Sequence, residues 1–223
     1  MIEPIVIPVP VSEVYCKKIF EVNTIEDAKA IILTAERGAT TDERWEAETP
    51  YLLELIAESC AITENSTVLD FGCGIGRIAK ALIQKFNCKV VGVDNSHMTK
   101  LAVEYVDSPN FSVMTSEEFQ PESFKFDFAV AVWVLQHCLD PILEVNKIKR
   151  SLKSKGRLFV ANNKFRCIPI IYKDKFIWSG DNLDIHKLLN GNFNIIVKNG
   201  VLDPASLAQD ATEYAFYSVH EKL

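Results

Sequence analysis

The sequence predicts an α/β protein in which a parallel β-sheet carries helices on both faces. The first observation is a short apolar run, residues 67–71, that ends in a glycine-rich turn and continues at helical spacing over residues 76–87. The second is that strand and helix then alternate along the chain, with strands at 89–94, 111–114, 127–133 and 156–162 and helices at 97–106 and 141–152. Parallel strands need crossover connections, and helices in those connections cover the sheet.

Two helices are expected before this sheet. Thr24 begins a capping-box-like start, and the helix continues over residues 28–37 and ends at Gly38. A second amphipathic helix is expected over residues 45–62, with Pro50 in its first turn or at a kink. After the sheet the pattern predicts a helix at 181–189 and strands at 193–201 and 213–219.

Composition indicates a soluble protein of one domain, residues 1–223. The net charge of −6 and the lack of a long basic run argue against a nucleic-acid partner. The six cysteines form no C-x-x-C pair and the four histidines add no ligand spacing, so we expect reduced thiols, no metal and a cytoplasmic location. The proline-broken start at residues 1–10 is expected to be neither a signal peptide nor a membrane anchor.

The turn after the first strand is the strongest indication of a ligand. Glycines stand at 72, 74 and 76, Asp70 precedes them and Arg77 follows. Glycine lets the backbone approach a ligand closely, and the helix N-terminus supplies unpaired N–H groups. The dinucleotide spacing G-x-G-x-x-G and the phosphate loop are both absent. A carboxylate at Asp70 disfavours a diphosphate and favours a nucleoside that carries an amino-acid tail.

A second acid ends the next strand. Asp94 lies 24 positions after Asp70 and could accept hydrogen bonds from both hydroxyls of a ribose. The alternative is that Asp94 caps the following helix together with Asn95 and Ser96.

Four segments in this order resemble the class I S-adenosylmethionine (SAM)-dependent methyltransferases, of the type that modifies small molecules. They are Asp70 to Gly76, Val91 to Asp94, Phe126 to Cys138, and Leu152 to Val160. The resemblance covers residues 50–165. It implies a Rossmann-like, mostly parallel sheet of seven strands with one antiparallel strand near the C-terminus. It also implies an N-terminal helical cap or lid (1–45), a SAM-binding core (46–165), and a C-terminal segment (166–223) that holds the substrate side and the last strands.

The resemblance assigns SAM as the cofactor and S-adenosylhomocysteine (SAH) as its product. Asp94 would hold the ribose, and Asp70 would reach the ammonium group directly or through water. The acid that the family often places after the third strand is missing, because Thr115 and Ser116 stand there, so the adenine contact stays open. The expected cofactor-binding residues are Asp70, Gly72, Cys73, Gly74, Gly76, Asp94, Asn95, Thr115, Ser116 and Val132.

Residues for the acceptor side are weighed against structural roles. His137 follows the fourth strand and is either a general base or a residue that orients neighbours. Trp133 either walls the methyl-transfer pocket or packs on the prefix helix. Segment 163–180, with Arg166, is either a specificity element or an irregular packing loop. Tyr15 and Trp45 are further substrate candidates, each with a packing alternative.

The expected function is transfer of a methyl group from SAM to an oxygen or nitrogen of a small metabolite, by a monomer or homodimer. Methyl transfer to protein or RNA is the rival enzyme hypothesis, and a non-catalytic SAM-binding regulator is the other alternative.

Overall fold

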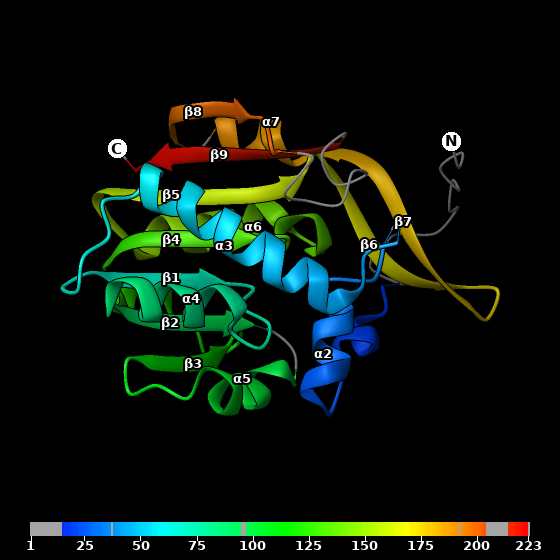
Figure 1. The fold of residues 1–223 in the computed structure, drawn as a ribbon. Coiled ribbons are helices and arrows are strands. Elements are labelled where there is room, and N and C mark those ends of the chain that lie inside the picture. The colour runs from blue at the N-terminus through cyan, green and yellow to red at the C-terminus, as the bar shows by residue number, and fades with distance from the viewer. Residues whose placement is uncertain (1–14, 37, 95–96, 192, 204–213, 223) are drawn as a thin grey trace.

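The protein is described by a computed structural model covering residues 15–36, 38–94, 97–191, 193–203 and 214–222. Its centre is a seven-stranded sheet with the order β3-β2-β1-β4-β5-β9-β8 (Figure 1). These strands are β1 (Thr67–Phe71), β2 (Lys89–Asp94), β3 (Phe111–Thr115), β4 (Phe126–Val132), β5 (Leu152–Asn163), β8 (Asn194–Gly200) and β9 (Ala215–Glu221). Strands β1 to β5 pair in parallel, whereas β9 runs antiparallel to both of its neighbours. The expected sheet, with one antiparallel strand near the C-terminus, is confirmed.

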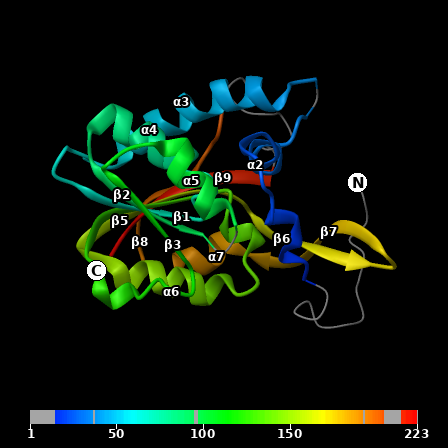
Figure 2. The same ribbon diagram turned by 90° about the horizontal axis from the view of Figure 1, so that it is seen from below.

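Helices cover both faces of this sheet (Figure 2). On one face lie α3 (Thr41–Ser59), α4 (Arg77–Phe86) and α5 (Met98–Val106); on the other lie α6 (Pro141–Ser151) and α7 (Ile185–Asn190). Leu52 and Leu82 are fully buried against the first face, and Val145 and Ile148 are fully buried against the second. The apolar strands are therefore sandwiched between two helical layers, as in other open α/β folds.

The first two helices differ from the expectation. Helix α2 (Ile25–Ile32) ends at Ile32 instead of residue 37, and α3 begins at Thr41 instead of Trp45. Thr40 and Glu43 form a full capping box that starts α3 early. Helix α2 does not continue to residue 37 because the next carbonyl, that of Leu33, accepts a hydrogen bond from the Thr41 hydroxyl of α3 at 2.9 Å. Pro50 consequently lies inside α3 rather than in its first turn.

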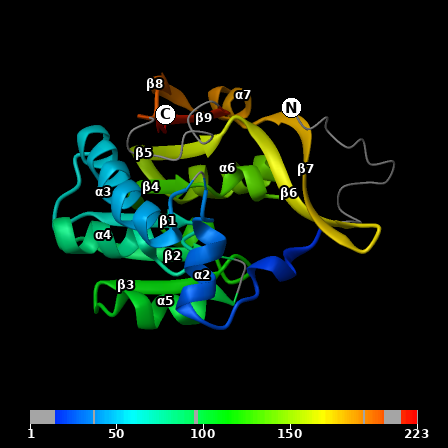
Figure 3. The same ribbon diagram turned by 45° about the vertical axis from the view of Figure 1, so that its right-hand side comes forward.

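Segment 163–180 is also regular rather than an irregular loop. Strands β6 (Phe165–Tyr172) and β7 (Lys175–Asp184) form a separate antiparallel hairpin beside the main sheet (Figure 3). Strand β7 runs through residues 181–184, so α7 starts at Ile185, with Asp184 as its N-cap. Tyr15 forms an isolated bridge to Ile170, which ties the N-terminal side of the chain to this hairpin.

Three short 3₁₀ turns complete the described elements: η1 (Lys17–Phe20), η2 (Pro121–Ser123) and η3 (Leu135–His137). Among the described residues no helix is both long and apolar enough to cross a bilayer.

Candidate active site

A cavity of about 730 Å³ opens at the carboxyl ends of β1, β2 and β4. Its size is that of a ligand site, and the ends of parallel strands are where open α/β sheets bind ligands. Ten of the predicted site residues line it: Tyr15, Asp70, Gly72, Cys73, Gly74, Asp94, Ser116, Val132, Trp133 and His137. Four others, Trp45, Gly76, Thr115 and Arg166, are not among its lining residues. Asn95 lies outside the described residues.

The glycine turn packs too tightly for side chains. Gly72 and Gly74 have φ values of +72° and +54°, in the region that favours glycine. A Cβ on Gly72 would lie 2.2 Å from Val134 Cγ2, and one on Gly74 would lie 2.7 Å from Ile32 Cδ1. Gly76 is the N-cap of α4 and faces Val106 rather than the cavity. The turn is therefore held between α2, which contributes Ile32, and the segment that follows β4.

Asp94 connects the turn to the end of β2. Its Oδ2 accepts a hydrogen bond from the Gly74 backbone N–H at 2.9 Å. The backbone N–H of Ser116, just after β3, donates to the Asp94 carbonyl at 3.0 Å. A single carboxylate thus fixes the turn at the cavity wall while it borders the cavity itself.

Asp70 is a buried carboxyl group at the end of β1, only 2% exposed. It accepts a hydrogen bond from the Ala79 backbone N–H at 3.0 Å. Burial raises its pKa to about 7, and the charge of Asp94 adds to this, while the Ala79 hydrogen bond and the Arg77 guanidinium oppose it. Because Asp70 titrates near neutrality, a cation placed in the cavity would favour its ionised form.

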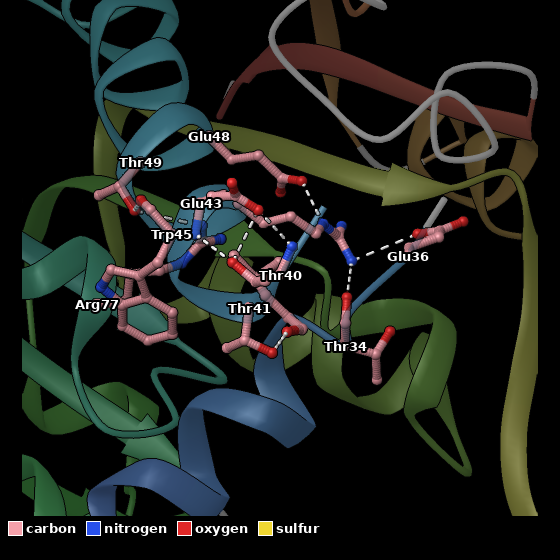
Figure 4. Close-up of polar contacts among 11 residues, drawn as sticks. Thr34, Glu36, Thr40, Thr41, Glu43, Trp45, Glu48, Thr49 and Arg77 are labelled. Atoms are coloured by element: carbon pink, nitrogen blue, oxygen red, sulfur yellow. Dashed lines mark hydrogen bonds and ion pairs between the residues drawn. The ribbon is translucent and has the colours of Figure 1, made fainter. Parts of the chain in front are cut away.

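A buried ionic cluster borders the cavity on the α3 side (Figure 4). Arg44 donates through Nε to Glu48 Oε1 at 2.8 Å and through Nη1 to the Thr34 carbonyl at 2.5 Å. Arg44 Nη1 also lies 3.3 Å from Glu36 Oε2. Arg44 and Glu48 are 8% and 1% exposed, so the pair is shielded from water. It locks the chain between α2 and α3 against the cavity.

Arg77 and Trp45 belong to the same cluster. The Arg77 guanidinium, which also lines the cavity, lies 5.4 Å from the centroid of the Trp45 ring. Burial lowers the pKa of Arg77 to about 10, against the opposing charges of Glu48 and Asp70. The Trp45 indole N–H donates to the Tyr105 hydroxyl at 3.0 Å. Trp45 therefore packs between helices and does not reach the cavity.

His137 lies in an aromatic cluster that also lines the cavity. Its ring centroid is 4.8 Å from that of Trp178 on β7 and 6.3 Å from that of Phe20 on η1. Nδ1 lies 2.6 Å from the Cys167 carbonyl, which can only accept, so Nδ1 carries the proton and Nε2 is an acceptor facing the Gln136 amide at 3.2 Å. Burial lowers the pKa of His137 to about 4, so the ring is neutral at physiological pH.

Two other candidates have defined positions. Trp133 has a φ of +57°, and its backbone N–H donates to the Ala161 carbonyl at 2.8 Å. Its indole Nε1 is buried and lacks a hydrogen-bond partner within the described part of the chain. Arg166 does not line the cavity: it pairs with Asp181 and donates to the carbonyl of Leu139, which is a lining residue.

Several lining residues were not predicted as site residues. They come from α2 and the segment after it, from η1 and from α6: Ile32, Thr34, Glu36, Phe20 and Glu144. Trp178 of β7 also lines the cavity and lies within segment 163–180, the candidate specificity element. The Thr40–Glu43 capping box was a local sequence signal for the α3 start. Nothing local in the sequence indicated that β7 would bring Trp178 beside His137.

Comparison with known proteins agrees with this architecture. A family model described as "Methyltransferase domain" matches residues 40–166. Over 130 residues the chain is 33% identical to a probable (S)-tetrahydroprotoberberine N-methyltransferase 2 of Papaver bracteatum, covering 55% of this chain and 35% of that protein. Over 103 residues it is 32% identical to a ubiquinone biosynthesis O-methyltransferase of Bartonella tribocorum, covering 44% of this chain and 41% of that protein.

The solved structure of the PH0226 protein from Pyrococcus horikoshii shares the fold, with a TM-score of 0.61 and 18% identity. The alignment covers 87% of this chain and 96% of that one. Of the two methyltransferases named above, by contrast, this chain spans only 35% and 41% of the length. Because the family match spans more than half of the sequence and coincides with the strands that build the cavity, the chain belongs to the methyltransferase-domain family.

Proposed function

We propose that this protein transfers a methyl group from SAM to an oxygen or nitrogen atom of a small molecule. The observation that carries the proposal is the cavity at the strand ends, where Asp70 and Asp94 flank the glycine turn. In this proposal Asp94 accepts hydrogen bonds from the ribose hydroxyls, and Gly72, Cys73 and Gly74 lie along the methionine part. Asp70 stabilises the ammonium group, and Ser116 and Val132 border the adenine.

The charges of the cavity fit a cationic donor. Its described lining carries five carboxyl groups and two guanidinium groups. Arg44 pairs with the buried carboxylate of Glu48, and Arg77 interacts with the charges of Glu48 and Asp70. A sulfonium and an ammonium group are favoured by such a surplus of negative charge, whereas a diphosphate is not. SAM supplies an activated methyl group, so alignment and exclusion of water can supply much of the rate enhancement.

The acceptor is proposed to bind beyond Trp133, against His137, Trp178 and Phe20. Aromatic rings provide flat apolar walls that suit a ring-bearing molecule and also attract an amine. The unpartnered Trp133 Nε1–H is a polar group in this region that could orient the acceptor, and His137 Nε2 could do so only by exchanging its bond with the Gln136 amide. Both curated relatives carry names of small-molecule N- or O-methyltransferases, which supports an amine or a hydroxyl acceptor.

The remaining parts of the proposal concern organisation. Residues 1–45 would form a cap over the donor, residues 46–165 the donor-binding core, and residues 166–223 the acceptor side. The chain would act as a monomer or homodimer without nucleic acid. All six cysteines are free, which supports residence in a reducing compartment such as the cytoplasm.

Two measurements test the proposal. Calorimetry with SAM and SAH should show saturable binding, and a screen of amines and phenols with an isotope-labelled methyl donor should show turnover. Binding without turnover of any small molecule would favour a non-catalytic regulator, and turnover confined to protein or RNA would favour the rival enzyme. Absence of binding would refute the proposal.

A further inference from the structure

The acids that follow β3 are unavailable to the cavity. Glu118 Oε2 accepts hydrogen bonds from the Thr115 backbone N–H at 2.8 Å and from the Thr115 hydroxyl at 2.9 Å. Glu117 and Glu118 are both exposed, and neither belongs to the cavity lining. No described residue on this strand end therefore offers a carboxylate to a bound base.

A different carboxylate reaches the same part of the cavity from α6. Glu144 lines the cavity, and its Oε1 pairs with Lys147 Nζ at 3.1 Å. Lys147 Nζ also lies 3.5 Å from Ser116 Oγ, so the first turns of α6 adjoin the end of β3. Ser116 in turn bonds to the Asp94 carbonyl, which places Glu144 on the β3 side of the proposed ribose position.

The second oxygen of Glu144 is unsatisfied. Oε2 is buried and has no hydrogen-bond partner among the residues that the structure describes. A buried carboxylate oxygen without a donor is costly, so its retention at a cavity wall points to a donor brought by the ligand. Burial raises the pKa of the Cys138 thiol, and the charges of Glu144 and Asp94 add to this, in keeping with two carboxylates that border one region of the cavity.

We propose that Glu144 Oε2 accepts a hydrogen bond from the exocyclic amino group of adenine, so that α6 supplies the base-reading acid that is absent after β3. The assignment rests on the proposed function, because it requires the donor to bind with its ribose at Asp94. An amino group at the purine 6-position donates to a carboxylate. An oxo group at that position presents only an acceptor, so the two oxygens would repel.

The test compares SAH with S-inosylhomocysteine, in which the 6-amino group is replaced by oxygen. One charge-assisted hydrogen bond predicts that the wild-type protein binds SAH about 10- to 100-fold more tightly. Glu144→Gln can turn its amide toward either group, so the preference should fall to about threefold or less. Glu117→Gln, the same exchange at an exposed site near Ser116, should retain the wild-type preference.

The outcomes separate the two levels of the argument. Equal affinity of the wild-type protein for the two compounds would overturn the assignment without any variant. An unchanged preference for SAH in folded Glu144→Gln would also overturn the assignment, but it would not contradict the proposed binding of SAM. Failure of the wild-type protein to bind either compound would overturn the proposed function, and the role of Glu144 with it.

Discussion

Replacing Asp94 by alanine tests the centre of the proposed donor site. Oδ2 of Asp94 accepts the Gly74 N–H at 2.9 Å, and the same carboxylate is proposed to accept hydrogen bonds from the ribose. Loss of these charge-assisted bonds, together with an unsatisfied Gly74 N–H, should weaken SAH binding by about 2–3 kcal/mol, or about 30- to 150-fold. Titration calorimetry at constant pH and salt measures this change directly.

Two further variants separate the charge from the turn. Asp94→Asn keeps an oxygen for the Gly74 N–H but loses the charge, so its affinity should lie between those of the wild type and the alanine variant. Glu104→Ala removes an exposed carboxylate on the helix that follows β2 and should leave binding unchanged. If folded Asp94→Ala binds SAH within about twofold of the wild type, the ribose assignment is wrong.

Four other outcomes follow from the site. Because the pKa of Asp70 is raised to about 7, SAH affinity should increase as the pH rises through neutrality, as calorimetry in a series of buffers would show. The raised pKa also removes stability as the pH rises from the unfolded-state value of 3.8 to about 7, so Asp70→Asn should melt above the wild type at alkaline pH but not in acid. His137 has a pKa of about 4 and is therefore neutral at physiological pH. If its ring acts on the acceptor, His137→Phe should lower kcat without abolishing SAH binding, and an unchanged kcat would eliminate that role. Trp178→Ala should raise the acceptor KM about tenfold through lost ring contact, whereas Phe176→Ala, equally exposed at 43% but outside the cavity lining, should not.

The sheet was predictable because its signals are local. Two apolar strands end in Asp70 and Asp94 and are separated by one helix, so both acids are expected at the same edge of a parallel sheet. The observed register pairs Asp70 with Gly92 and Asp94 with Thr115. The glycine positions likewise predicted a turn with positive φ. These features depend on a few consecutive residues, which the sequence displays directly.

The acceptor side was harder to predict because distant contacts decide it. The α2 pattern continues past Ile32, but the carbonyls that follow are taken by Thr41 and Arg44 of the next helix. Trp45 is a large aromatic residue of a kind that often lines pockets, yet its indole N–H donates a hydrogen bond to the Tyr105 hydroxyl. Arg166 is drawn to Asp181 across the hairpin, a pairing set by β6–β7 register rather than by local sequence.

Ile32 of α2 fills the space that a side chain at position 74 would need. The same glycine donates its N–H to Asp94, so the residue that packs beside Ile32 of α2 is also bonded to the proposed ribose acceptor. A side chain at position 74 would have to displace Ile32 and would also disturb the peptide N–H that is bonded to Asp94. One backbone amide therefore links the placement of α2 to the carboxylate that we propose binds the ribose.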